Sequence, residues 1–376
     1  YSLHTSDTGK VMGSGLTRVF DIDQSTGRQT QVGQDIWGRG SSDLTPDHSM
    51  AVISSDYRWM AVCSLGSGWA GFVRPGTGGE GWFDPSEGEV TMWELNEADA
   101  SDPVSLPHWV EMGEPIRGEI IDGERFGFPV SISNRGEVVA VGSYSPDSGI
   151  RVHVNEETSP RVWTLKGSVI TGEAPLRNER IETLPPGWWV SLSDDGNTVA
   201  LGTFLKNSAN LSGLVNVLQF DPSIGDWLPR GDPIKGKSAS DFFGLSVDLS
   251  NDGKTIVVEE LGVLGVGLIS VFEFNEVSSQ WNQLGSDLSG YLLDSMFQCR
   301  ITANGHRVFA VFAIDNGYAC VFDYDEQLYD WRVVGGIIEG PKQILTLALV
   351  SACPLQMDQC WQLGGQLGGM KMILEA

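Results

Sequence analysis

The sequence lacks the short motifs that mark the common enzyme classes. Its five histidines, His4, His48, His108, His153 and His306, are scattered and fit no His-Glu-x-x-His or His-x-His spacing. No Gly-x-Ser-x-Gly elbow, P-loop or dinucleotide fingerprint stands between a predicted strand and a predicted helix. Apolar runs long enough to cross a bilayer are absent as well. From these absences we expect no catalytic residue, no cofactor and no membrane span.

Basic residues are scarce. There are 24 Lys and Arg against 49 Asp and Glu, which gives a formal net charge of −25. Such a charge opposes binding to a nucleic-acid backbone or to an anionic membrane surface, and it favours cations or basic partners. The ordinary interpretation of the acidity is a solubilising surface.

Cysteine is also rare, with five residues: Cys63, Cys299, Cys320, Cys353 and Cys360. An odd count leaves at least one thiol free or intermolecular. Cys299 and Cys320 fall on predicted strands that have another strand between them, so we do not expect them to pair. Cys353 and Cys360 flank a candidate turn, and both a small disulfide loop and a pair of buried thiols are open for them. No spacing resembles a zinc site.

A repeat built on tryptophan and glycine is the strongest positive signal. A Trp is followed by Gly four residues on and by another Gly five further on. The five Trp are Trp109, Trp163, Trp227, Trp281 and Trp331. A sixth copy keeps Gly33 and Gly38 but has Gln29 in place of the Trp. The first Gly recurs at intervals of 80, 54, 64, 54 and 50 residues.

A hairpin pattern precedes each of the five tryptophans. VSISNRGEVVAVG, VSLSDDGNTVALG and VDLSNDGKTIVVE alternate apolar and polar residues around a tight turn, and CRITANGHRVFAV and AVISSDYRWMAVC are variants. Four short strands in each unit and a period of this size are typical of propeller blades. We therefore predict an all-β fold, a β-propeller of four-stranded antiparallel blades, as a single domain over residues 1–376.

The two ends of the chain decide the expected number of blades. Residues 1–40 contain a strand over 15–23 and an outer strand, but no inner hairpin, whereas residues 341–376 resemble a degenerate inner hairpin. One blade shared by the two ends gives six blades, and separate terminal blades give seven. The sequence begins at Tyr1 without an apolar leader, so we expect a removed targeting segment or an upstream start.

An aromatic insertion is the candidate partner-binding segment. Residues 67–89 carry Trp69, Phe72, Trp82 and Phe83 among glycines and prolines. These rings either bind a protein partner or fold back over the edge of their own blade. The five repeat tryptophans, by contrast, are expected to pack between blades or against their own sheet.

The repeats resemble a known family. The FG of FGFPV and FGLSV, the Ser-x-Asp-Gly hairpins and the VxxG that follows resemble FG-GAP repeats of the integrin α-chain propeller. Together with WxxLGxxLxG they are similar to the FG-GAP-like repeat proteins of diatoms and related algae, which are predicted to be secreted. The resemblance implies a propeller used in adhesion or assembly. Its calcium loop is not kept: at Asp21 and Asp23 we expect a plain turn rather than a calcium site.

Two functions of different class follow. Since the predicted inner strands carry few carboxylates beyond Asp248, we interpret the chain as a non-catalytic interaction or structural module, not an enzyme, that docks with protein partners in a larger extracellular or lumenal assembly. The alternative is a carbohydrate-binding or carbohydrate-active propeller that uses its central channel.

Overall fold

The structure is a computed structural model, and it describes most of the predicted repeat region. The described residues are 2–6, 16–23, 25–26, 28–37, 49–64, 88–97, 106–118, 126–143, 149–156, 161–171, 189–203, 213–237, 243–261, 267–289, 296–312 and 318–339. They form strands and turns and no helix, which confirms the all-β prediction. The chain divides into two compact units, 1–171 and 172–376, each with three antiparallel sheets.

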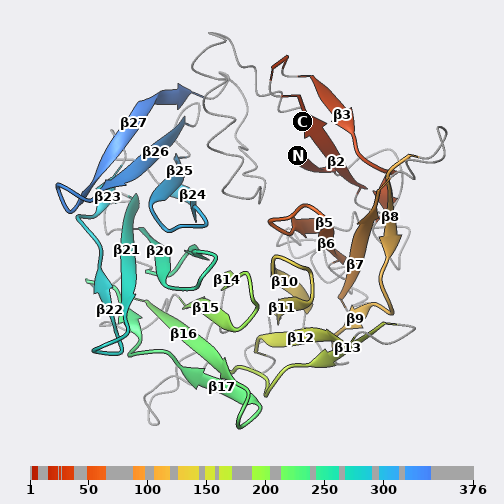
Figure 1. The fold of residues 1–376 in the computed structure, drawn as a ribbon, viewed down its shortest axis with the longest axis horizontal. Coiled ribbons are helices and arrows are strands. Elements are labelled where there is room, and N and C mark those ends of the chain that lie inside the picture. The colour runs from red at the N-terminus through yellow and green to blue at the C-terminus, as the bar shows by residue number, and fades with distance from the viewer. Residues whose placement is uncertain are drawn as a thin grey trace, which may run out of the picture. The chain divides into compact units, whose positions relative to one another are not determined.

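The first unit holds the sheets drawn in red to yellow in Figure 1. Its first sheet comprises β1 (Ser2–Ser6), β2 (Leu16–Ile22), β3 (Gln29–Gln31) and β4 (Ile36–Trp37). The second comprises β5 (Ser49–Ile53), β6 (Trp59–Ser64), β7 (Glu89–Asn96), β8 (His108–Glu111) and β9 (Ile116–Arg117). The third comprises β10 (Phe126–Ile132), β11 (Val138–Ser143), β12 (Arg151–Glu156) and β13 (Val162–Leu165).

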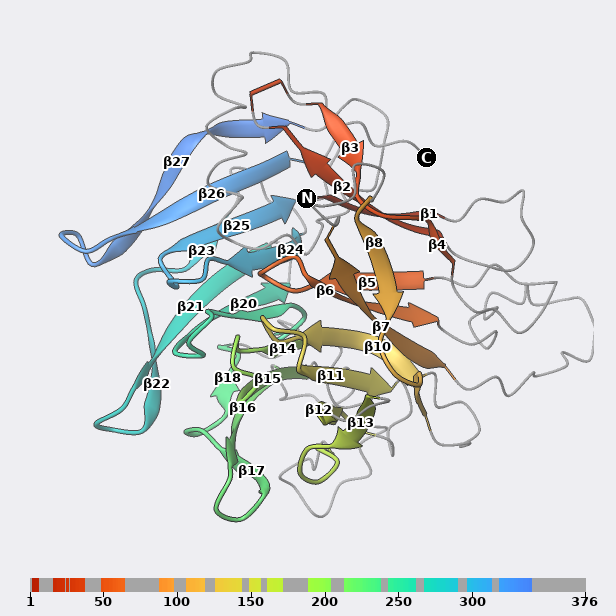
Figure 2. The same ribbon diagram turned by 45° about the vertical axis from the view of Figure 1, so that its right-hand side comes forward.

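The second unit repeats the plan in green to blue. Its first sheet comprises β14 (Trp189–Leu192), β15 (Thr198–Thr203), β16 (Leu214–Asp221), β17 (Asp226–Pro229) and β18 (Ile234–Lys235). The next comprises β19 (Val247–Leu249), β20 (Thr255–Leu261), β21 (Gly267–Asn275), β22 (Gln280–Gln283) and β23 (Leu288–Ser289). The last comprises β24 (Met296–Ile301), β25 (Arg307–Phe312), β26 (Tyr318–Asp325) and β27 (Asp330–Glu339), which follow one another in order in Figure 2.

The first hairpin of a sheet is set by its turn sequence. In the β10–β11 turn the Ser133 hydroxyl accepts a hydrogen bond from the Val138 N–H at 3.0 Å. Gly136 has a φ of +65°, which a residue with a side chain rarely adopts. Ser193 and Ser250 accept the same bond in their own turns, each at 2.9 Å. The Ser-x-x-Gly pattern therefore fixes the register of these hairpins.

At the amino-terminal end the structure has a strand that the sequence pattern missed. β1 pairs antiparallel with β2 over five residues, from Ser2 opposite Phe20 to Ser6 opposite Leu16. Residues 341–376, the predicted other half of a shared blade, lie outside the described residues, as does the 67–87 part of the aromatic insertion. The shared blade and the single-domain organisation stay predictions.

Successive sheets of a unit are joined by a tryptophan of one sheet whose indole ring packs against a glycine of the preceding sheet. The indole N–H of Trp109 donates to the Val32 carbonyl of the preceding sheet at 3.0 Å. A Cβ built on Gly33, where φ is +77°, would lie 2.5 Å from Cδ1 of Trp109. No side chain fits in that space, so Gly33 makes room for the Trp of the next motif.

The same contact recurs in the second unit. Trp281 and Trp331 donate to the carbonyls of Arg230 and Leu284, each at 2.7 Å. Cβ atoms built on Gly231 and Gly285 would lie 3.2 and 2.7 Å from the Cδ1 atoms of these two rings.

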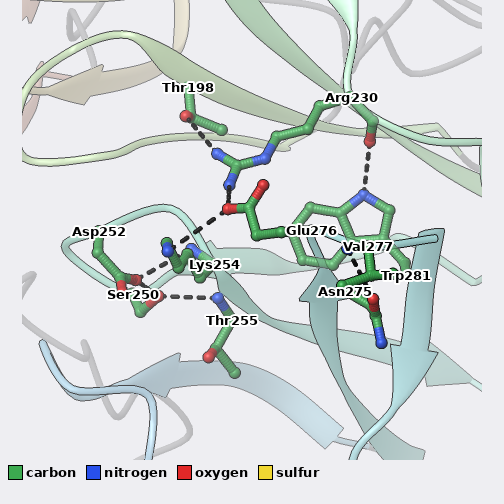
Figure 3. A network of polar contacts seen from close by, with 10 residues as sticks. All are labelled: Thr198, Arg230, Ser250, Asp252, Lys254, Thr255, Asn275, Glu276, Val277 and Trp281. Carbon is green, nitrogen blue, oxygen red and sulfur yellow. Dashed lines mark hydrogen bonds and ion pairs between the residues drawn. The ribbon is translucent and has the colours of Figure 1, made fainter. Parts of the chain in front are cut away.

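A polar network reinforces one of these sheet contacts (Figure 3). The buried Arg230 guanidinium donates to Thr198 Oγ1 at 3.1 Å and to Glu276 at 3.3 Å, and it lies 4.5 Å from the centre of the Phe274 ring. Lys254 pairs with the same Glu276 at 3.4 Å. Because Thr198 belongs to β15 and Glu276 follows β21, this network ties two sheets together beside Trp281.

Replacing Trp281 with alanine should therefore destabilise the second unit. Removal of a buried aromatic ring costs about 3–5 kcal/mol, and about 2–4 is expected for this partly buried ring with its hydrogen bond. Thermal unfolding monitored by circular dichroism measures the effect. Leu328→Ala is the control, since the Leu328 side chain is 69% exposed. A Trp281→Ala melting curve equal to that of the parent would contradict a packing role.

His153 gives the first unit a pH-dependent stability. Burial, and then the charge of Arg151, lower the pKa of His153 to about 4, and neither ring nitrogen has a hydrogen-bond partner. The unfolded chain therefore binds this proton more readily than the folded chain, so stability is retained above the unfolded pKa of about 6.5 and falls as pH drops toward 4.

We expect His153→Leu to reduce the loss of unfolding free energy between pH 7 and pH 4. At about 1.4 kcal/mol per pKa unit, the histidine lowers the unfolding free energy by about 3 kcal/mol between pH 7 and pH 4. Urea unfolding at both pH values measures the difference, and the exposed His108→Leu is the matched control. An equal acid-induced loss in parent and His153→Leu would show that His153 is not responsible.

Candidate functional site

The first strands of the three sheets in the second unit bring charged residues together. β19 lies between β14 and β24 and contacts both. Counted from the turn that follows each strand, Ser191, Asp248 and Arg300 occupy equivalent positions. A serine, an acid and a base thus stand in a row across three neighbouring strands.

Asp248 is held by donors from the two strands on either side of β19. Its Oδ1 accepts from the Ser191 hydroxyl at 3.0 Å, and its Oδ2 accepts from the Ile301 N–H at 3.0 Å. Burial raises the pKa of Asp248, and the Arg300 charge and these hydrogen bonds oppose the rise. The carboxyl group therefore links β19 to β14 and β24, and both of its oxygens already accept hydrogen bonds.

Glu259 differs from Asp248 because its oxygens are unoccupied. It lies on β20 with no exposed surface, and neither Oε1 nor Oε2 has a hydrogen-bond partner among the described residues. Its backbone is fixed, since its N–H donates to the Ser246 carbonyl at 2.9 Å. Burial raises the pKa of Glu259 to about 7, although the Arg300 charge lowers it. A carboxyl with that pKa can both take up and release a proton at neutral pH.

Arg300 is the cation of the site. Its guanidinium lies 5.4 Å from the centre of the Trp189 ring, and its Nη1 donates to the Cys299 carbonyl at 3.1 Å. Both the Arg300 and Trp189 side chains are partly exposed. Burial and then the Glu259 charge raise the pKa of the neighbouring Cys299 thiol, so this cysteine is not a thiolate nucleophile.

The site coincides with a break in the repeat. Position 259 is a glycine in two other sheets, Gly142 and Gly202. A Cβ built on Gly202 would lie 2.1 Å from the Gly244 carbonyl oxygen, so the backbone of the next sheet fills this place. At the start of β24, Met296 stands where the repeat has the glycines Gly127 and Gly244. Two departures from a structural rule on contacting strands are typical of a functional site.

A comparison of equivalent repeat positions would have found this site from the sequence. It shows Glu259 in a column with Cys63, Gly142, Gly202 and Val311. The expectation that carboxylates are few is correct for the first strands. It missed Glu259 because that residue comes from the second strand of its sheet.

The site residues predicted from the sequence lie elsewhere. Trp69, Phe72, Trp82 and Phe83 fall outside the described residues, as do Cys353 and Cys360. The repeat tryptophans lie on the fourth strands: Trp109 on β8, Trp163 on β13, Trp227 on β17, Trp281 on β22 and Trp331 on β27. None of these tryptophans belongs to the polar cluster on β14, β19, β20 and β24.

At the predicted plain turn, the Asp23 carboxylate accepts hydrogen bonds from the turn itself. Its Oδ1 accepts from the N–H of Ser25 at 2.8 Å and of Thr26 at 3.0 Å. Across the described ranges, no group of three or more His, Cys, Asp or Glu side chains is arranged to hold a metal ion.

Comparison with known proteins gives matches among solved structures. No family model and no curated protein matches the sequence. The periplasmic gluconolactonase of Pseudomonas aeruginosa superposes with a TM-score of 0.53 at 16% identity, over 89% of this chain and 81% of that one. A candidate 6-phosphogluconolactonase from Bacteroides uniformis gives 0.48 at 15% identity, over 90% and 96%. A β-propeller domain from Myceliophteria thermophila gives 0.49 at 14%, over 91% and 86%.

The chain has a β-propeller fold. At these identities the likeness extends to the fold alone, and the successive antiparallel sheets of four or five strands agree with it. The resemblance to FG-GAP-like repeats stays a prediction. Within the part of the chain that is described, no helix is long and apolar enough to span a bilayer.

The prediction of a non-catalytic interaction module that is not an enzyme is wrong. The structural match that overturns it is the periplasmic gluconolactonase, and it favours the carbohydrate-active alternative. The motif search behind that prediction could not weigh an isolated acid such as Glu259, which lies within an apolar strand and forms no recognisable motif.

Glu259 should make the second unit less stable above neutral pH. Its pKa is higher in the folded chain than the ordinary 4.5, so the folded state is favoured while the group is protonated and stability falls as pH rises from 4.5 through about 7. Glu259→Gln should therefore raise the unfolding free energy at pH 8.5 by about 3 kcal/mol and change it little at pH 4.5. Denaturant unfolding at the two pH values measures this.

Glu273→Gln is the matched control for this measurement, since Glu273 is exposed on the neighbouring β21. It should leave the pH dependence unchanged. A Glu259→Gln variant that is destabilised equally at both pH values would show that the carboxyl is satisfied and not titrating near neutrality.

Proposed function

We propose that this chain is a hydrolase that opens a carbohydrate lactone at the site formed by Glu259, Arg300 and Trp189. The observation that carries the proposal is Glu259, a buried carboxyl with two unpartnered oxygens and a pKa of about 7 beside an arginine. A group of that kind is suited to general acid–base catalysis. The fold shared with a gluconolactonase supports the choice of substrate class.

In the proposed reaction, ionised Glu259 removes a proton from a water molecule, and the water oxygen bonds to the acyl carbon of the lactone. The positive charge of Arg300 stabilises the negative charge that develops on the carbonyl oxygen. The bond between the acyl carbon and the ring oxygen then breaks, and Glu259 returns its proton to that oxygen. One lactone and one water give one hydroxy acid, and no cofactor or oxidant enters the balance.

Trp189 supplies the carbohydrate contact in this proposal. An aromatic ring that is partly exposed beside polar groups suits the apolar face of a sugar ring. An extracellular or lumenal location belongs to the same proposal, and the gluconolactonase of similar fold is periplasmic. Binding of protein partners through Trp69, Phe72, Trp82 and Phe83 is not needed for the reaction.

The test is hydrolysis of δ-gluconolactone by the purified chain, followed as acid release in a pH-stat and corrected for spontaneous hydrolysis. The catalysed rate should rise as pH increases through about 7, because Glu259 acts in its ionised form. Glu259→Gln should lower kcat by about 100-fold or more, the usual contribution of a general base.

Two features make this result decisive. Glu259→Gln is expected to be more stable than the parent, so lost activity cannot be ascribed to unfolding, and Glu273→Gln should keep the parent rate. No acceleration over the spontaneous rate, or an unchanged rate in Glu259→Gln, contradicts the proposal.

A further inference from the structure

Arg300 presents donors that the described protein does not use. Nη1 donates to the Cys299 carbonyl, and the face of the guanidinium lies against Trp189. Nε and Nη2 make no hydrogen bond, and no carboxylate of the described residues lies within ion-pair distance of Arg300. Two contacts therefore fix the plane of a partly exposed guanidinium whose other edge is free to bind a ligand.

The charge around this edge depends on Glu259. Arg300 from β24 acts on two acids here: its charge lowers the pKa of Asp248 on β19 and of Glu259 on β20, and the neutral Cys299 thiol lies beside it. Glu260 follows on the same strand but points to its opposite face, since successive side chains of a strand alternate. With Glu259 protonated, Arg300 faces one acid fewer, and an anion meets less repulsion.

We propose that Arg300, held on Trp189, binds the carboxylate of a sugar acid, and that the anion is bound together with one proton on Glu259. The sugar part of this ligand rests on the proposed function, in which a sugar acid is the product. The carboxylate part rests on Arg300 alone. Release of the product would then be favoured above neutral pH, where Glu259 is ionised and repels the anion.

A carboxylate fits this site better than a phosphate does. One guanidinium edge matches the two oxygens of a carboxylate in a bidentate pair. A phosphate monoester carries up to two charges at neutral pH and is usually met by several cations, whereas Asp248 and Glu259 add negative charge here. The net charge of −25 also disfavours a dianion.

The experiment is calorimetric titration of the purified chain with gluconate at pH 6 and pH 8, in pairs of buffers that differ in ionisation enthalpy. If binding requires protonated Glu259, affinity should fall about tenfold from pH 6 to pH 8. Near pH 7.5 the heats should show net proton uptake. Affinity that does not change with pH overturns the proton linkage.

Variants assign the roles. Glu259→Gln should bind gluconate equally at both pH values, because an uncharged amide replaces the titrating group. Arg300→Gln should lose binding at both, and Arg300→Lys, which keeps the charge but not the fork, should bind more weakly than the parent. Arg332→Gln is the matched control, since Arg332 pairs with Asp325 on the last sheet at 3.4 Å and should not affect binding. Parent-like binding by a folded Arg300→Gln overturns the assignment.

Two further ligands test the chemistry. Glucose should bind much more weakly than gluconate, and equal binding would show that the anion is not recognised. Glucose 6-phosphate should also bind more weakly, and tighter binding would overturn the carboxylate assignment. The outcome is separable from the proposed function: lactone hydrolysis without pH-linked gluconate binding refutes this inference alone, whereas gluconate binding without hydrolysis refutes the hydrolase alone.

Discussion

The contact between a fourth-strand tryptophan and the glycine of the preceding sheet is the constraint on which the rest of the structure depends. The indole needs a carbonyl acceptor and a flat space, and only a glycine with positive φ leaves that space free at Gly33, Gly231 and Gly285. Once the sheets are spaced in this way, their first strands lie close enough for one side chain to span them. Asp248, bonded to β14 and β24, depends on that spacing.

Inside this regular frame, the candidate site is a local exception. In two other sheets the equivalent position is a glycine, Gly142 or Gly202, and neighbouring atoms lie close to it. Glu259 occupies this position in its own sheet and has no hydrogen-bond partner among the described residues. A buried carboxyl of this kind costs free energy when it is ionised. Packing around the tryptophans does not remove that cost, so Glu259 destabilises a fold that remains stable overall. Function is the usual reason why a destabilising residue is kept.

The sequence predicted the fold well because the fold is periodic. The motif of a Trp followed by two glycines, as at Trp109, occurs five times in one register. The Ser-x-x-Gly turn, as at Ser133, fixes several hairpins in the same way. β1 was missed because its sequence, Ser-Leu-His-Thr-Ser, has one large apolar residue and lacks the pattern that marks the other first strands. The site was missed for a different reason. Glu259 and Arg300 lie far apart along the chain, and the burial that raises the Glu259 pKa exists only after the sheets pack.

A repeat frame also explains why this function is hard to recognise in any sequence of the class. In a repeat fold each unit contacts only its neighbours, so a change in one sheet leaves the distant sheets in place. One acid in place of a glycine and one arginine in place of a serine are then enough to create a polar site between two sheets. Neither residue disturbs the period, so the repeat conceals the two substitutions at which we propose the chemistry. Function in such a fold is found by looking for the sheet that breaks the pattern.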